Sequence, residues 1–193
     1  LLVEGYTDAV APLQFQFTAS EHSDAPVAVS GLGVVRVGTI AAGQAVTNTF
    51  TAPAGLWVYY DSQDRNNAGS LVAELRDPTG AVVFSYNAAF DTQSLQGYGL
   101  PRSGTYQMII KGNSPGATGS FRYRLLDLNS GIPALALGST LNGTFEADYR
   151  TDIYQFAGQA GQRLLYDGLQ NDFASVTARL LLPDGQIRIV NGN

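Results

Sequence analysis

The sequence matches itself over much of its length when it is shifted by 105 to 107 positions. The matching landmarks include apolar segments, aromatic pairs and turn residues, so the similarity is not confined to one motif. Self-similarity at a fixed period is the signature of tandem structural units, and we predict units of about 106 residues. The clearest matches are residues 2–5 with 109–112, Phe15 and Phe17 with Phe121 and Tyr123, Tyr60 and Asp61 with Tyr166 and Asp167, and residues 78–80 with 183–185.

The period divides the chain into three parts. Residues 1–24 correspond to the closing strands of a preceding unit, residues 25–130 form a complete unit, and residues 131–193 begin the next unit. The opening residues read as the tail of a strand, so we expect the chain to be a piece of a longer protein. Because exposed strand edges are avoided, we also expect residues 1–20 to complete the third part, within the chain or in a neighbouring copy.

Short strands and turns alternate within the complete unit. Residues 45–51 and 121–125 alternate between apolar and polar side chains, a period that places one face of a strand in a core. Residues 56–60 form an apolar run, which predicts a central strand buried on both faces, and residues 77–80 are typical of a type I turn. This pattern predicts an all-β fold, an antiparallel β-sandwich of jelly-roll or immunoglobulin-like type with no helix longer than two turns. Further strands are expected at residues 71–75, 81–86 and 105–110.

Charge and cysteine content narrow the class of protein. Only 14% of the residues are charged, the net charge is −5 and there is no cysteine. An acidic balance without clustered Lys or Arg argues against nucleic-acid partners. The lack of cysteine excludes disulfides and thiolate sites, and no apolar run is long enough to cross a membrane as a helix. We therefore expect a secreted bacterial protein, extracellular or at the cell surface, without membrane insertion.

Residues suited to catalysis are scarce. The sole histidine, His22, lies in a polar stretch that reads as an exposed linker, whereas acid–base catalysis usually needs a His or a carboxylate pair on a rigid scaffold. The sequence has no nucleophile elbow, phosphate-binding loop or zinc-binding His-Glu motif. We therefore predict no catalytic residue and no enzymatic activity.

Two oxygen-rich loops are candidate calcium sites. Asp61 and Asp64 lie in one loop, Asp167 and Asp172 lie in the matching loop of the next unit, and both loops follow an apolar strand that ends in Tyr. Ca²⁺ prefers carboxylate, amide and carbonyl oxygens. Asp also populates loops because its side chain bonds the local backbone, and Arg65 disfavours a strong cation site. Both interpretations stay open, with Ca²⁺ as the one candidate cofactor.

Aromatic residues offer a second candidate site. Tyr86, Phe90, Tyr98 and Tyr106 would stack on sugar or peptide groups if they lay together on an exposed sheet face. The alternative is that these rings belong to the core, where aromatic side chains contribute much of the buried area. Asn142 begins an Asn-Gly-Thr glycosylation sequon, but Asn-Gly is equally a turn signal.

Residues 152–156 read Asp-Ile-Tyr-Gln-Phe, and an apolar strand with a Pro-Asp-Gly turn follows at residues 180–185. Residues 100–106 and 119–123 carry Leu-Pro-x-x-Gly-Thr-Tyr and Gly-x-x-x-Tyr patterns. Together these motifs resemble bacterial pre-peptidase C-terminal domains, although the complete unit has Thr-Asn-Thr-Phe at residues 47–50 in place of the Asp-x-Tyr-x-Phe motif. The resemblance implies β-sandwiches that are appended to secreted proteases or strung along surface proteins, some of which bind calcium, polysaccharide or collagen.

These observations favour a structural or adhesive repeat module of a secreted bacterial surface protein, with filament formation by strand complementation as its mode of assembly. Its expected partners are adjacent units or neighbouring copies, together with polysaccharide or a host matrix protein. The alternative is a calcium- or carbohydrate-binding accessory module of a secreted hydrolase. The number of such units in the parent protein would separate the two functions.

Overall fold

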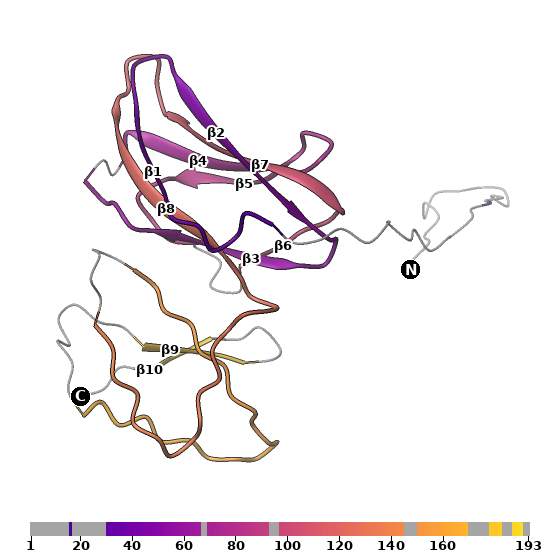
Figure 1. Ribbon diagram of the computed structural model, residues 1–193, viewed down its shortest axis with the longest axis vertical. Helices are drawn as coiled ribbons and strands as arrows, with labels where there is room; N and C mark the ends of the chain where they lie inside the picture. The colour runs from indigo at the N-terminus through magenta and orange to yellow at the C-terminus, as the bar shows by residue number, and fades with distance from the viewer. Residues whose placement is uncertain are drawn as a thin grey trace, which may run out of the picture.

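The chain folds into a β-sandwich followed by a largely extended segment that ends in a hairpin (Figure 1). The computed structural model describes residue 16 and residues 30–66, 69–92, 97–144, 150–169, 178–182 and 187–190. Across these ranges the secondary structure consists of strands and turns without a helix, so the predicted all-β class is confirmed. The expected closing strands within residues 1–24 lie outside the described residues, apart from residue 16.

Two antiparallel four-stranded sheets form the two layers of the sandwich. One sheet has the strand order β1-β8-β3-β6 and the other has the order β2-β7-β4-β5, while β9 and β10 pair separately. The strands are β1 (Arg36–Ile40), β2 (Ala45–Ala52), β3 (Trp57–Ser62), β4 (Leu71–Arg76), β5 (Val82–Asn87), β6 (Tyr98–Gly99), β7 (Gly104–Gly112), β8 (Gly119–Asp127), β9 (Ala178–Leu181) and β10 (Ile187–Val190).

Alternation along the strands builds the core. In β8 the side chains of Phe121, Tyr123 and Leu125 are buried, and the intervening positions are more exposed. The same period places every second side chain of β7 between the sheets. Strands β7 and β8 each lie second in their sheet, so each pairs with a neighbour on both sides.

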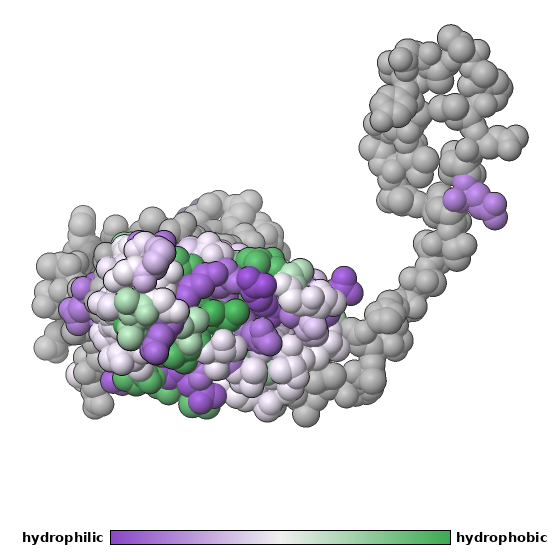
Figure 2. Space-filling view, turned by 90° about the horizontal axis from the view of Figure 1, so that it is seen from above, coloured by the Kyte–Doolittle hydropathy of each residue, from purple (hydrophilic) through white to green (hydrophobic). Residues whose placement is uncertain are grey.

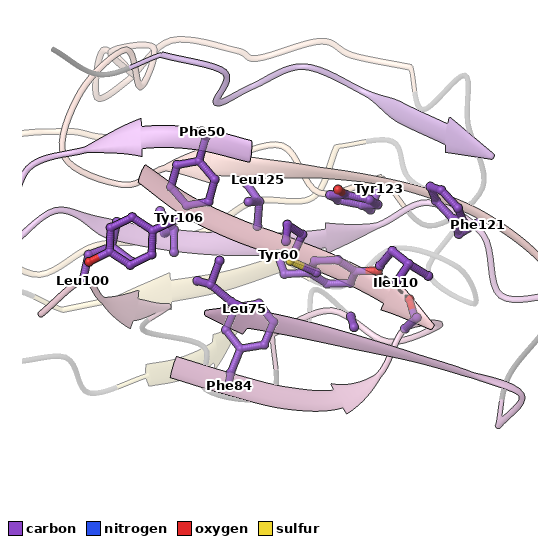
Figure 3. Packing of buried hydrophobic residues seen from close by; sticks show 14 of the residues in the cluster. Phe50, Tyr60, Leu75, Phe84, Leu100, Tyr106, Ile110, Phe121, Tyr123 and Leu125 are labelled. Carbon is purple, nitrogen blue, oxygen red and sulfur yellow. Dashed lines mark hydrogen bonds between the residues drawn. The ribbon is translucent and has the colours of Figure 1, made fainter. Parts of the chain in front are cut away.

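Aromatic side chains fill the centre of this core (Figure 3). The ring of Tyr60 stacks on Tyr123 with centroids 5.3 Å apart and meets Phe84 and Tyr86 edge-on at 6.2 and 5.8 Å. Its hydroxyl donates to the carbonyl oxygen of Ala88 at 2.8 Å, so the buried polar atom is satisfied. Burial of each large apolar side chain contributes about 1.5–3 kcal/mol to stability.

The predicted turn at residues 77–80 forms and closes the β4–β5 hairpin. The amide of Gly80 donates to the carbonyl oxygen of Asp77 at 2.9 Å, and the Asp77 carboxylate accepts the amides of Thr79 and Ala81, each at 2.9 Å. Gly80 has a φ of 87°, a conformation that a residue with a side chain adopts only with strain. The Asp-Pro-Thr-Gly sequence therefore specifies this turn.

Strand β1 was not expected from the sequence, and its packing explains why. Its inner position Gly38 faces Phe121 of β8, where an added Cβ would lie 2.6 Å from the ring. Only glycine leaves room for that ring, and a glycine interrupts the apolar alternation by which strands are recognised. The two-residue strand β6 was missed because it is too short to carry a period.

The described residues beyond position 130 are mostly extended without pairing. Their only strand pair is the antiparallel hairpin of β9 and β10, and an isolated bridge joins Ala134 to Gln155. The tandem repeat therefore stays a prediction. Seen from above, the described surface is a mosaic of hydrophilic and hydrophobic residues (Figure 2).

Tyr106 anchors one end of the sandwich through its hydroxyl. The hydroxyl donates to the carbonyl oxygen of Arg102 at 2.6 Å and accepts the Arg102 amide at 3.1 Å, while the ring stacks on Phe50 with centroids 5.3 Å apart. A tyrosine that bonds the backbone a few residues upstream is a hallmark of immunoglobulin-like sandwiches.

We expect Tyr106→Phe to lower the free energy of unfolding by about 1 kcal/mol, because the backbone groups of Arg102 lose a partner while the ring remains. Urea denaturation would show a lower midpoint with an unchanged slope. Tyr154→Phe, at a tyrosine that is 38% exposed, is the control and should leave the midpoint in place. Equal midpoints for the two variants would contradict an anchoring role.

Candidate functional site

Strand β3 is buried on both of its faces, as the sequence predicted. Val58 and Tyr60 point into the core, but Tyr59 and Asp61 point outward and are also buried, with 5% and 0% of their surface exposed. The outer face of a sandwich sheet normally meets solvent. Thr151 and Asp152 contact this face, and Figure 1 shows the chain beyond the sandwich on the side of β3 and β8.

The centre of this outer face is an ion pair between adjacent strands. Asp61 of β3 and Arg124 of β8 are cross-strand partners, and Arg124 Nε donates to Asp61 Oδ2 at 2.6 Å. Gln63 Nε2 donates to the same oxygen at 3.0 Å, and the backbone amide of Thr151 donates to Asp61 Oδ1 at 3.0 Å. Both oxygens of this fully buried carboxylate therefore have partners, which is the condition under which a buried charge is tolerated.

Thr151 is held through its backbone and its side chain. Besides the bond to Asp61, its carbonyl oxygen accepts a hydrogen bond from Arg124 Nη2, and its hydroxyl donates to Asp91 Oδ2 at 3.3 Å. The other oxygen of Asp91 accepts the amide of Ser62 at 2.8 Å. We call Asp61, Asp91, Arg124 and Thr151 the junction cluster, because it joins the sandwich to the segment that follows.

A second layer of charge extends the junction cluster. Asp152 Oδ1 lies 3.6 Å from Arg124 Nη2 and accepts a hydrogen bond from Arg150 Nε at 2.8 Å. Arg124 therefore binds Asp61 on its own sheet and two consecutive residues of the following segment. Asp152 is the first residue of the Asp-x-Tyr-x-Phe motif, so the motif contacts the sandwich through this side chain.

The environment of the junction cluster shifts two pKa values. Burial raises the pKa of the Asp91 carboxyl to about 6, and the negative charge of Asp61 adds to the rise, although the Ser62 amide opposes it. Burial also raises the pKa of the Tyr59 hydroxyl to about 12, again with a contribution from Asp91. The Asp91 carboxyl therefore gains or loses its proton near pH 6. The hydrogen bonds and ion pairs of the cluster hold the following segment against the sandwich.

The predicted calcium ligands do not converge on one point in the described structure. Asp61 is occupied as above, and Asp64 accepts the Asn66 amide at 2.9 Å and the Ser120 hydroxyl at 2.6 Å. Asp167 is exposed, and Asp172 lies outside the described residues. A search of the described residues for three or more His, Cys, Asp or Glu side chains that could hold a metal ion finds none. Calcium binding stays a prediction.

The four predicted ligand-binding aromatics lie in three different surroundings. Tyr86 and Tyr98 stack with centroids 6.4 Å apart beside the core residue Phe84, which lies 4.7 Å from Tyr98. Phe90 is 42% exposed, whereas Tyr106 is fully buried against Phe50 and offers no ring to a ligand. The exposed Trp57, which the sequence analysis did not single out, pairs with Gly99 of β6, where a Cβ added to the glycine would lie 3.3 Å from the indole ring.

Three members of the junction cluster were missed from the sequence. The sequence does contain a signal for the pairing of Asp61 with Arg124. The two opposite charges each follow a core tyrosine, Tyr60 or Tyr123, and they become neighbours when the two strands pair. Asp91 and Thr151 carry no local pattern, because their role depends on a contact across 60 positions of sequence.

Comparisons with known proteins do not assign this chain to a family. No family model matches it, and no curated protein matches it. Among solved structures, a periplasmic inhibitor of g-type lysozyme, PliG from Aeromonas hydrophila, is similar over 48% of this chain and 81% of that chain, with 15% identity and a TM-score of 0.36. The described residues contain no helix that is long and apolar enough to cross a membrane.

We expect Asp61→Asn to lower the free energy of unfolding by about 3 kcal/mol, because the largely buried Arg124 guanidinium loses its nearest carboxylate and keeps only Asp152 at 3.6 Å. Urea denaturation of Asp61→Asn, Arg124→Met and the double variant would measure the coupling between the two residues. The double variant should be more stable than the sum of the single losses predicts. Additive losses would contradict a coupled pair.

The raised pKa of Asp91 also sets a pH dependence. The folded chain holds this proton more tightly than the unfolded chain. The free energy of unfolding should therefore rise as pH falls through about 6, and the whole gain should be present below pH 3.8. The Lys111 ammonium beside Glu74 lowers the pKa of that carboxyl, so its contribution is lost only below its ordinary value of 4.5. Between pH 7 and 5 the Asp91 effect should therefore dominate.

Thermal unfolding at pH 7 and pH 5 in a His22→Gln background, which removes the one histidine, would measure this effect. We expect a higher Tm at pH 5, and Asp91→Asn should abolish most of the difference. A pH response that survives in Asp91→Asn would assign it to another group.

Proposed function

We propose that this chain is a structural repeat module of a secreted bacterial surface protein, in which sandwich units are joined through fixed junctions. The observation that carries the proposal is the fully buried Asp61, whose carboxylate binds Arg124 of its own sheet and the Thr151 amide of the following segment. A flexible linker would leave both groups in solvent. A buried contact of this kind supports a defined orientation between one unit and the next.

The composition supports the same role. A chain with 14% charged residues and no cysteine relies on packed strands instead of disulfides, which suits an extracellular bacterial scaffold. Adjacent units and neighbouring copies are then the primary partners. A polysaccharide or a matrix protein would be the second kind of partner if the module is adhesive.

An accessory carbohydrate-binding module is the second candidate. Trp57, which is 41% exposed, favours it, since an exposed indole is a stacking platform for a sugar ring. A glycan array with wild type and Trp57→Ala would test this function, and a rise in Tm on replacing EDTA by millimolar calcium would test the calcium form of it. Binding that depends on Trp57 would favour the accessory module.

Junction rigidity is the direct test of the structural role. The chain has no cysteine, so Thr105→Cys on β7 and Ala160→Cys beyond the junction would place spin labels only at two exposed positions. We expect a narrow distribution of label distances, because Asp61, Asp91 and Arg124 all hold Thr151. Thr151→Pro removes the amide that Asp61 binds and should broaden the distribution.

Thr140→Pro, at an exposed position of the same segment, is the matched control and should leave the distribution narrow. A broad distribution already present in the wild type would overturn the fixed junction, and with it the main support for a structural role.

A further inference from the structure

The Asn142-Gly143 sequence, which the proposed function does not use, lies in an exposed part of the segment that follows the sandwich. Residues 136–144 are all exposed, and residues 141–144 form neither a strand nor a turn. The Asn-Gly turn that the sequence allowed is therefore not formed, and both residues are open to water.

The backbone amide of Gly143 is available for a reaction with the side chain that precedes it. Among the described residues, no hydrogen bond engages this amide or the Asn142 side chain. A Cβ built at position 143 would meet no atom within 4 Å, so nothing crowds this part of the backbone. Because glycine has no side chain, its backbone reaches the bent conformation that brings its nitrogen to the side-chain carbonyl carbon of Asn142.

Asn129 is also followed by a small residue, but hydrogen bonds hold both reacting groups there. The amide of Ser130 donates to Asp127 Oδ1 at 3.2 Å, and the Asn129 side chain accepts the Trp57 amide at 2.6 Å. The nitrogen that would attack and the carbonyl group that would be attacked are therefore both bound to other partners.

Asn87 is restrained in the same way. The amide of the next residue, Ala88, donates to the carbonyl oxygen of Leu71 at 3.0 Å, and the Asn87 side chain accepts the Ala89 amide at 3.0 Å. A reaction between neighbouring groups at this position would first have to break both bonds. Asn142 therefore combines a glycine neighbour, exposure and an unengaged amide, which Asn87 does not.

We propose that Asn142 is a deamidation site, at which water converts the asparagine to a mixture of aspartate and isoaspartate. The Gly143 nitrogen gives up its proton to the solvent and attacks the side-chain carbonyl carbon of Asn142, the bond to the side-chain nitrogen breaks, and ammonia leaves. Water then opens the cyclic imide at either of its carbonyl groups. One opening gives aspartate, and the other gives isoaspartate, whose main chain runs through the side-chain carbon. Water is the only co-reactant, and asparagine is among the residues that are chemically labile in this way.

The modification changes the connection between the sandwich and the junction cluster. Each conversion adds one negative charge to a chain whose net charge is −5, and the isoaspartate form also adds a carbon atom to the main chain. The connection is held on both sides, since the Leu135 amide donates to the carbonyl oxygen of Gln155 at 2.7 Å and the Thr151 amide donates to Asp61. The change is therefore confined to the exposed stretch between these contacts. Because ammonia is lost, it accumulates with the age of each copy, a property that goes beyond the proposed structural role.

Peptide mapping by mass spectrometry, on the full chain stored in warm and mildly alkaline buffer, tests the proposal. We expect the peptide that contains Asn142 to gain the mass difference between asparagine and aspartate and to separate into two chromatographic peaks. Gly143→Val is the matched control, because position 143 has room for a Cβ and lies outside the left-handed region. A β-branched side chain hinders ring closure, so this variant should convert more slowly by about tenfold or more.

A second variant separates the effect of structure from that of sequence. Ser130→Gly places the same dipeptide at Asn129, where the following amide is held by Asp127. Since the folded chain must open locally before that amide reacts, Asn129 should convert about tenfold or more slowly than Asn142 in the same sample. An Asn142 peptide of unchanged mass, equal rates in Gly143→Val and the wild type, or equal rates at Asn129 and Asn142 in Ser130→Gly would each overturn the proposal.

Discussion

The position of β7 and β8 inside their sheets is the constraint on which the rest of the structure depends. Each is the second strand of four and supplies hydrogen bonds to both neighbours, so β1 and β2 join their sheets through β8 and β7. Their inward residues also provide much of the aromatic core, including Tyr106, Phe121 and Tyr123. The two strands that complete the sandwich are therefore the last two in its sequence, and each lies between strands that precede it in the chain.

The junction cluster shows how the same sheet serves two interfaces. The inner side of β3 contributes to the core through Val58 and Tyr60, and the outer side contributes Tyr59 and Asp61 to the contact with the following segment. A hydrophobic outer face would also bind a neighbour, but it would do so without a directional partner. The carboxylate of Asp61, which accepts from a side chain on one side and a backbone amide on the other, makes this contact directional.

The strand pattern of the sandwich followed from period-two alternation, and residues 45–51, 71–75 and 121–125 all form strands near the expected boundaries. Asp61 shows where that reasoning stops. An Asp after an apolar run reads as the start of a loop, yet β3 continues through Ser62 because β8 pairs with it from Val58 to Ser62. Its burial comes from Thr151, 90 positions away, and no local pattern encodes that contact. The same holds for Tyr106, whose burial depends on Phe50 across the sheet.

The pairing of β1 with β8 has a mechanical consequence. These strands are antiparallel neighbours, so the chain enters the sheet beside Arg36 and leaves it beyond Tyr123, at the same end. Tension applied through the flanking chain would load their backbone hydrogen bonds one after another from that end, and not all at once. The exit is clamped where the Leu128 amide donates to the carbonyl oxygen of Trp57 at 2.9 Å and the Asn129 side chain accepts the Trp57 amide at 2.6 Å. Tension from the chain that follows would first load the contacts of Thr151 with Asp61 and Arg124, and only then these few bonds beside Trp57.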